Sequence, residues 1–248
     1  MNRFLTLTLA TVVLSVGSAA SASLIVDTVI YADPLDGVSG DLDGTSPSDR
    51  GGTGLVDWDA NSVFKANGDI AEGDDSGAWL PFVPTAGNIY QLSADVNTTG
   101  SSNTNQWNTL GFSDAGDTSE DFIPQGYATM LLRDVRTGAT AFTGLGTAGS
   151  SGFDPPAGVV EFAIVLDATD ANSANWTAEF FLDGTSLGAS ATVSSGDFGD
   201  ITHVGFSTLK DAAGTVADFQ LATVIPEPAS LALLGLGGLV MLSGRRRK

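Results

Sequence analysis

Residues 176–184 read WTAEFFLDG, and this short stretch indicates the fold of the whole domain. Every second side chain is apolar from Trp176 to Leu182, while the positions between them carry a threonine, a glutamate and a phenylalanine. Such a period of two is typical of a strand with one buried and one solvated face. Asp183-Gly184 then supplies a turn that can adopt positive φ, so residues 185–193 are expected to return as the hairpin partner.

The same period recurs along the middle of the chain, between short clusters of Gly, Asp, Asn, Ser and Pro. No long helical period separates these runs, which argues against βαβ units. Residues 33–77 alternate less and are expected to form long loops, with short edge strands at 55–58 and 62–65. The sequence therefore predicts an all-β fold, a two-sheet antiparallel jelly-roll sandwich. Its clearest expected strands are residues 89–96, 127–134, 159–167, 176–182, 201–209 and 216–221.

The first 22 residues have the pattern of a secretory signal. A basic start at Arg3 precedes an apolar stretch at residues 4–16 and a small-residue segment that contains Ala20 and Ala22. The apolar stretch is short for a membrane span, which needs about 20 residues. We therefore expect a signal helix at residues 1–22 that is cleaved after Ala22 during export.

The C-terminal residues combine a proline motif, an apolar run and a basic end. Pro226, Glu227 and Pro228 come first, and the two prolines should separate the last strand from the helix that follows. The apolar run at 229–242 is expected to form a short transmembrane helix, which suits a temporary anchor because a permanent span takes about 20 residues. The positive charges after it should stay on the cytoplasmic side as a membrane stop; they are Arg245, Arg246, Arg247 and Lys248.

These ends divide the chain into a signal peptide at 1–22, a sandwich domain at 23–224 and a sorting tail at 225–248. All 29 Asp and Glu lie within residues 23–228, together with five of the ten Lys and Arg, so this stretch carries a net charge of −24. Such a field attracts cations, calcium or magnesium above all, and repels nucleic acid, which excludes a nucleic-acid-binding protein. The absence of cysteine excludes disulfides and thiolate sites.

The last 24 residues resemble the C-terminal sorting domain of PEP-CTERM proteins. Exosortases recognise such tails in bacteria that make exopolysaccharide, and the Pro-Glu-Pro signature marks the region where the tail is processed. The resemblance implies that Pro226, Glu227 and Pro228 form the recognition motif, with Ile225 where the family usually has valine. It also implies export by the secretion machinery, transient anchoring in the inner membrane, and a final place at the cell surface or in the extracellular matrix.

From residue 159 onward the strands are similar to the second half of laminin-G and concanavalin-like sandwiches. Members often carry an aromatic-rich strand that ends in Asp-Gly, as FFLDG does at residues 180–184, and closing strands like DITHVGFSTL at 200–209. This resemblance implies a carbohydrate or protein ligand, often with calcium, and in some branches glycoside hydrolysis.

A binding module of this kind would use exposed tryptophans as sugar platforms and loop carboxylates for calcium. Large aromatic residues more often fill sandwich cores, so each of the four is expected in the core; they are Trp58, Trp79, Trp107 and Trp176. Asp41 and Asp43, in the fragment DLDG, are the best calcium ligands but lack the later ligands of an EF-hand loop. Turn residues are the simpler interpretation of both, and of the cluster Asp114, Asp117, Glu120 and Asp121.

A glycoside hydrolase needs two carboxylates on one surface, separated by about 5 Å or by about 6.5–9.5 Å. On its own strand Glu161 shares a face with alanine and valine, and Glu179 shares one with Phe181, so neither strand supplies a pair. The single histidine, His203, is expected within a strand and cannot build a multi-histidine metal site. No catalytic residue is therefore predicted, and hydrolysis is the minor alternative.

A passive structural component of the extracellular matrix is a further alternative, which nothing in the sequence separates from a binding module. The sequence as a whole predicts an exported surface or matrix protein whose sandwich binds carbohydrate, exopolysaccharide in particular, or another matrix component.

Overall fold

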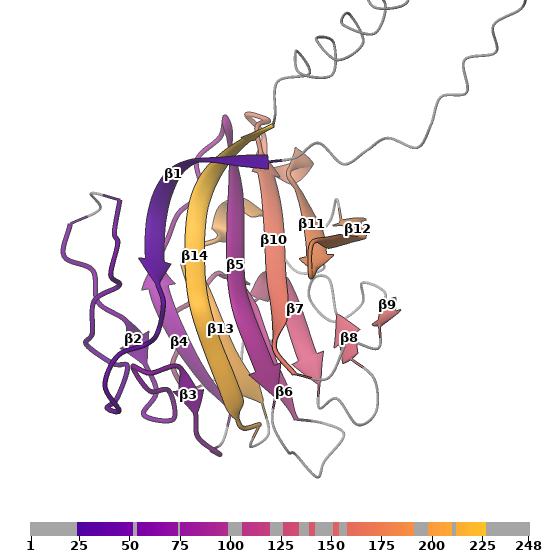
Figure 1. The fold of residues 1–248 in the computed structure, drawn as a ribbon. Helices are drawn as coiled ribbons and strands as arrows, with labels where there is room; N and C mark the ends of the chain where they lie inside the picture. Colours follow the sequence, from indigo (N-terminus) through magenta and orange to yellow (C-terminus); the bar gives the residue numbers. More distant parts are fainter. Residues whose placement is uncertain are drawn as a thin grey trace, which may run out of the picture. The chain divides into compact units, whose positions relative to one another are not determined.

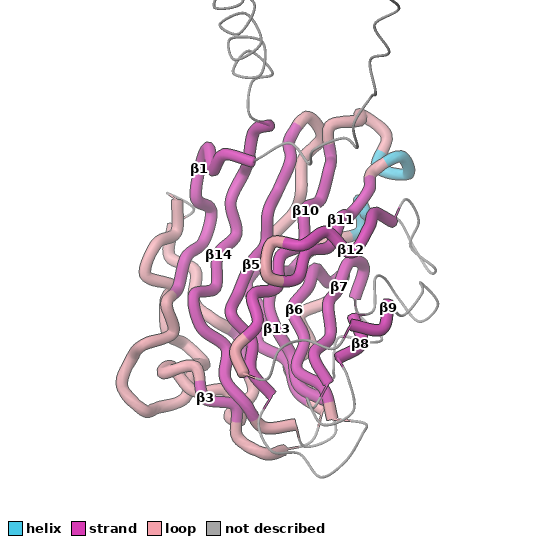
Figure 2. The backbone as a smooth tube through the Cα atoms, turned by 45° about the vertical axis from the view of Figure 1, so that its right-hand side comes forward, coloured by secondary structure: helices cyan, strands magenta, loops and turns pink. Residues whose placement is uncertain are grey.

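The computed structural model describes residues 24–51, 54–73, 75–98, 106–119, 126–133, 139–141, 151–153, 158–190, 198–209 and 212–226. These residues form the predicted sandwich of two antiparallel sheets (Figures 1 and 2). The signal helix, the cleavage site at Ala20 and Ala22, the apolar run and the basic end all lie outside the described residues. Within the described part of the chain, no helix is long and apolar enough to cross a membrane.

The larger sheet has seven strands in the order β1-β14-β5-β10-β11-β12, with β3 paired to one end of β14. The first and last strands of the domain therefore lie side by side (Figure 1). The strands of this sheet are β1 (Leu24–Asp33), β3 (Asp69–Ile70), β5 (Asn88–Thr98), β10 (Val160–Ala168), β11 (Thr177–Leu182), β12 (Thr185–Ser190) and β14 (Gly214–Pro226).

The smaller sheet has five strands in the order β2-β4-β13-β6-β7. They are β2 (Asp59–Ala60), β4 (Ser76–Pro81), β6 (Trp107–Ser113), β7 (Gly126–Arg133) and β13 (His203–Leu209), while β8 (Ala139–Ala141) and β9 (Ser151–Phe153) pair with each other. The structure confirms all six of the clearest predicted strands, as β5, β7, β10, β11, β13 and β14. The alternation did not reveal β6, because all seven of its residues are buried and neither face is wet.

Aromatic side chains fill the space between the sheets. The ring centroid of Phe206 on β13 lies 6.1 Å from that of Phe219 on β14, and Trp58 contacts both rings at 5.2 and 5.0 Å. These tilted and edge-on pairs are the favourable arrangements for aromatic rings. One aromatic cluster therefore joins the two sheets.

The segment at residues 33–77 is mostly loop, as predicted, but it also contributes to the core. Trp58 and Phe64 are each 1% exposed, and Phe64 packs edge-on against Phe206 at 5.3 Å. The expected edge strands at 55–58 and 62–65 are not formed as such: a two-residue strand begins at Asp59, and Phe64 makes only an isolated bridge. Trp58 stands between two exposed aspartates, Asp57 and Asp59, and its burial agrees with the core position expected for a large aromatic residue.

The Asp-Gly turn between β11 and β12 forms as expected. Asp183 and Gly184 have φ values of 47° and 70°, and Leu182 pairs with Thr185, which is a two-residue hairpin of the type that needs positive φ. Asp183 also joins this turn to β10: its Oδ1 accepts a hydrogen bond from the Glu161 N–H at 3.0 Å, and its own N–H donates to the Glu161 carbonyl at 3.0 Å.

Candidate binding site on the outer face of the seven-stranded sheet

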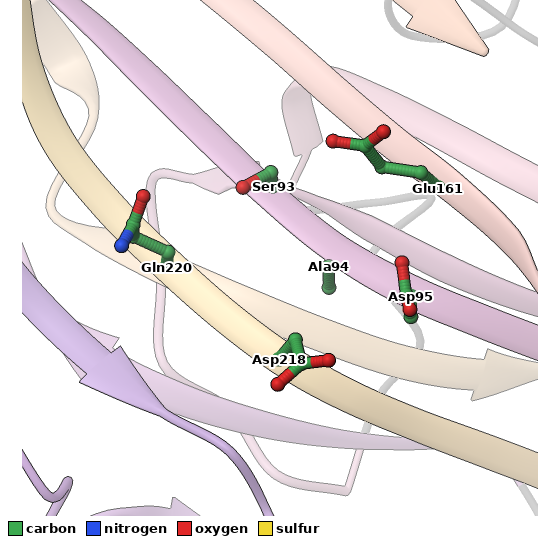
Figure 3. A pocket seen from close by; sticks show the side chains of 6 residues that line it. All are labelled: Ser93, Ala94, Asp95, Glu161, Asp218 and Gln220. Atoms are coloured by element: carbon green, nitrogen blue, oxygen red, sulfur yellow. The ribbon is translucent and has the colours of Figure 1, made fainter. Parts of the chain in front are cut away.

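A polar hollow of about 250 Å³ lies on the outer face of the larger sheet, across β14, β5 and β10 (Figure 3). Figure 3 shows carboxylates on all three strands around it. Its lining residues are Ser93, Ala94, Asp95, Glu161, Asp218 and Gln220.

Three of the six residues that line the hollow lie on β5, and the alternation of this strand decides which side chains face outward. Leu92 and Ala94 are at most 1% exposed and belong to the core, whereas Ser93 and Asp95 point to the outer face and are partly exposed. The register of β10 then sets Glu161 directly opposite Asp95. Directly opposed residues of antiparallel strands have Cβ atoms about 4.5–5.5 Å apart, so the two carboxylates are neighbours.

A bulge in β14 supplies the third carboxylate. Ala217 pairs with Asp95, but the next pair is Gln220 with Ser93, so two residues, Asp218 and Phe219, stand opposite Ala94 alone. Asp218 has a φ of 50°, and its N–H donates to the Pro34 carbonyl at 3.3 Å. Phe219 turns into the core at 1% exposure, while Asp218 is exposed beside Asp95. The bulge thus re-aims a side chain at the hollow.

The environment of Asp95 disfavours the charged form of its carboxyl group. Its partial burial, together with the nearby charges of Asp218 and Asp183, raises the pKa of its carboxyl above the ordinary value. Asp183 is held close to the group by its two hydrogen bonds with the Glu161 backbone. The hollow therefore offers several hydrogen-bond acceptors in a negative field, which favours ligands rich in hydroxyl groups and disfavours anions.

The described residues contain no group of three or more His, Asp or Glu side chains placed to hold one metal ion. The two calcium candidates have protein partners instead: Asp41 forms an ion pair with Lys65 at 2.6 Å, and Asp43 Oδ1 accepts from the Ala60 N–H at 3.3 Å. Both carboxylates thus stabilise the loop, and calcium binding stays a prediction.

In the second acidic cluster, the carboxylate of Asp117 has partners within its own loop. Asp117 Oδ1 accepts hydrogen bonds from the Ser119 N–H at 2.9 Å and the Ser119 hydroxyl at 2.7 Å, and these bonds lower the pKa of Asp117. The Asp117 carbonyl accepts from Trp79 Nε1 at 3.1 Å. Glu120 and Asp121 lie outside the described residues.

The structure confirms that all four tryptophans are core residues. Trp58, Trp79, Trp107 and Trp176 are 1%, 1%, 9% and 4% exposed. Among the described residues, Phe181 is an aromatic residue near the hollow, and it is partly exposed on the same outer face. It pairs with Ala163, which in turn pairs with Ser93 of the hollow.

His203 is the first residue of β13, and its side chain contacts the neighbouring Thr202. Thr202 Oγ1 donates to the Asp114 carbonyl at 2.7 Å and lies 2.8 Å from His203 Nδ1, so the ring nitrogen is the donor in that contact. Burial lowers the pKa of His203, and the charge of Asp59 opposes this effect.

The pairing of Asp95 with Glu161 could not be predicted from single strands, because alternation relates only the carboxylates along one strand. The wet face of residues 89–96 already contained Asp95, but the register that brings Glu161 opposite it is a tertiary property. The contribution of Asp218 depends on the bulge, which only the interruption of alternation in VADFQL at 216–221 could have indicated.

Residues 224–248 match the PEP-CTERM protein-sorting motif, which indicates export and surface localisation.

No curated protein matches the chain. Similar solved structures include the carbohydrate recognition domain of Emp47p, at TM-score 0.49 and 12% identity over 84% of this chain and 99% of that one. A Bacillus subtilis protein of unknown function with a galectin-like fold has TM-score 0.45 and 10% identity over 83% and 100% of the two chains. A Trypanosoma rangeli sialidase has TM-score 0.47 and 13% identity over 79% of this chain and 30% of its own.

Proposed function

We propose that this chain is an exosortase-sorted surface or matrix protein whose sandwich binds carbohydrate through the outer face of its seven-stranded sheet. The sorting motif at residues 224–248 and the signal pattern at 1–22 support the sorting step. On this proposal the tail anchors the chain in the inner membrane until exosortase processes it, and the domain then meets exopolysaccharide outside the cell.

The observation that carries the binding proposal is the polar hollow over β14, β5 and β10. Its carboxylates can accept hydrogen bonds from sugar hydroxyls, and the Gln220 amide can both donate and accept. Phe181 offers an apolar ring two strands away from Ser93 on the same face. These side chains stand on paired strands, so little backbone conformational entropy is lost when a ligand binds.

The charge of the domain narrows the class of ligand. A net charge of −24 over residues 23–228 repels polysaccharides rich in uronic acid or sulfate. A neutral or amino-substituted glycan fits both the field and the acceptor-rich hollow. We expect calcium to have no effect at this hollow, because its carboxylates do not form a cage for one ion.

Glycoside hydrolysis is the second candidate function, and one observation favours it. Asp95, with its raised pKa, lies directly opposite Glu161 on the neighbouring strand, and glycoside hydrolases use a pair of carboxyl groups on one surface. We propose binding without turnover as the main function; release of reducing sugar from a bound glycan would favour hydrolysis instead.

The test is retention of residues 23–226 on a panel of neutral, amino-substituted and acidic polysaccharides, with calcium and then with chelator. We expect retention on a neutral or amino glycan, and an affinity about tenfold lower for Gln220→Ala and for Glu161→Gln, since each loses one or two hydrogen bonds to the ligand. Glu72→Gln, an exposed carboxylate outside the hollow, is the matched control and should bind normally. No retention on any glycan would favour the passive matrix component.

A further inference from the structure

The sorting motif and the last strand of the sandwich share residues. The match to the motif begins at Val224, whereas β14 continues to Pro226. No linker therefore separates the folded sheet from the motif, and three residues of the motif are part of the strand.

Contacts within the sandwich hold this end of β14 in place. The strand lies between β1 and β5, with Thr223 paired to Tyr90 (Figure 1). The Thr223 hydroxyl lies 3.4 Å from both Asp27 Oδ2 and the Thr28 carbonyl of β1. Of the three shared residues, Val224 is 3% exposed, so its side chain belongs to the folded domain, whereas Ile225 and Pro226 are exposed at the end of the strand.

An enzyme that acts on a peptide usually binds it as an extended chain and uses its backbone groups and side chains. A residue on a strand between two others, with its side chain buried in the sandwich, cannot present its backbone groups and side chain to an enzyme while the strand stays paired. We propose that the sorting enzyme engages the motif only after the end of β14 leaves the sheet, so that the contacts with β1 and β5 limit the rate of tail processing. This inference rests on the proposed function, in which exosortase processes the tail.

The size of the effect follows from the population of the open strand end. When only the open form can react, the observed rate falls in proportion to its fraction. Exposing one buried valine side chain is expected to leave roughly one tenth of the molecules open. Processing should therefore be roughly tenfold slower than for a motif that is always free.

The test uses the full chain in membranes that contain the sorting enzyme, with loss of the tail followed by mass against time. Inserting Gly-Ser-Gly-Ser between Thr223 and Val224 keeps residues 224–248 intact and frees them from the sheet, so processing should become about tenfold faster. The same insertion after Leu55, in a loop where that side chain is 90% exposed, is the matched control and should leave the rate unchanged.

A second variant restrains the same strand end. Asp27→Cys combined with Thr223→Cys introduces the only two cysteines of the chain, at side chains that already contact each other. Their disulfide should slow processing, and a reductant should restore the wild-type rate. Equal rates for wild type and the Val224 insertion would overturn this inference alone. Absence of processing in both would overturn the proposed function as well.

Discussion

Asp95 on β5 lies directly opposite Glu161 on β10, and Asp218 from the bulge of β14 stands beside the pair. Like charges in opposed positions of a sheet are unfavourable for folding. A group of carboxylates on one patch of a sheet therefore costs stability, and such a cost is common at sites that bind ligands.

Replacing Asp95 by asparagine should stabilise the domain at neutral pH. A carboxyl whose pKa is raised in the folded state binds its proton more tightly there than in the unfolded chain. The stability of the domain therefore falls as the pH rises from 3.8, the pKa of the unfolded state, through the higher pKa of the folded state. Asp95→Asn removes this loss and should increase the free energy of unfolding by about 0.2–1 kcal/mol at pH 7. Urea unfolding of residues 23–226 measures it.

The pH dependence separates this effect from a change in packing. The gain from Asp95→Asn should shrink as the pH is lowered through the range where Asp95 takes up its proton, because the wild type then loses the same charge. Glu72→Gln, exposed and outside the group, should show no such trend. A gain that stayed constant from pH 7 to pH 4 would contradict the electrostatic explanation.

The sequence predicted which side chains of a regular strand are buried more fully than it predicted contacts between distant segments. The alternation of residues 89–96 correctly divided Leu92 and Ala94 from Ser93 and Asp95, because strand periodicity is a local property. The core position of Trp58 was expected from its residue type, but its packing against Phe206 and Phe219 could not be predicted, because β13 and β14 come from far along the chain. The site itself depends on register and on one bulge, and both are set by the pairing of distant strands.

Gly205 should not tolerate a side chain, although it lies in a regular strand. A Cβ atom at this position would approach the Ala78 carbonyl oxygen of β4 to 2.0 Å. Because the obstacle is backbone, the strands would have to separate, and Gly205→Ala should cost about 3 kcal/mol of stability. Gly40→Ala is the matched control: its nearest atom would be 3.9 Å away, and its unfolding midpoint in urea should stay near that of the wild type.

Phe206 should be among the most important residues for stability, because it contacts three other aromatic rings, two from the segment at residues 33–77 and one from β14. Its ring packs against Trp58, Phe64 and Phe219. Phe206→Ala should destabilise the domain by about 3–5 kcal/mol through lost burial and the cavity that forms. Phe206→Leu fills more of that space and should cost clearly less. A loss below about 1 kcal/mol for the alanine variant would be inconsistent with a shared core between the sheets.

His203 should make the domain less stable as the solution becomes mildly acidic. Burial lowers its pKa in the folded state, so below about pH 6.5 the unfolded chain binds a proton that the folded protein does not. Stability contributed by the neutral ring is therefore present above that pH and is lost as the pH falls toward the folded pKa, with a slope of at most about 1.4 kcal/mol per pH unit for one proton. His203→Gln cannot take up this proton, so the difference in unfolding free energy between wild type and variant should change between pH 7 and pH 5. If the unfolding free energies of wild type and variant changed in parallel over that range, His203 would have the same pKa in the folded and unfolded states. Any loss of stability in acid would then come from the carboxylates instead.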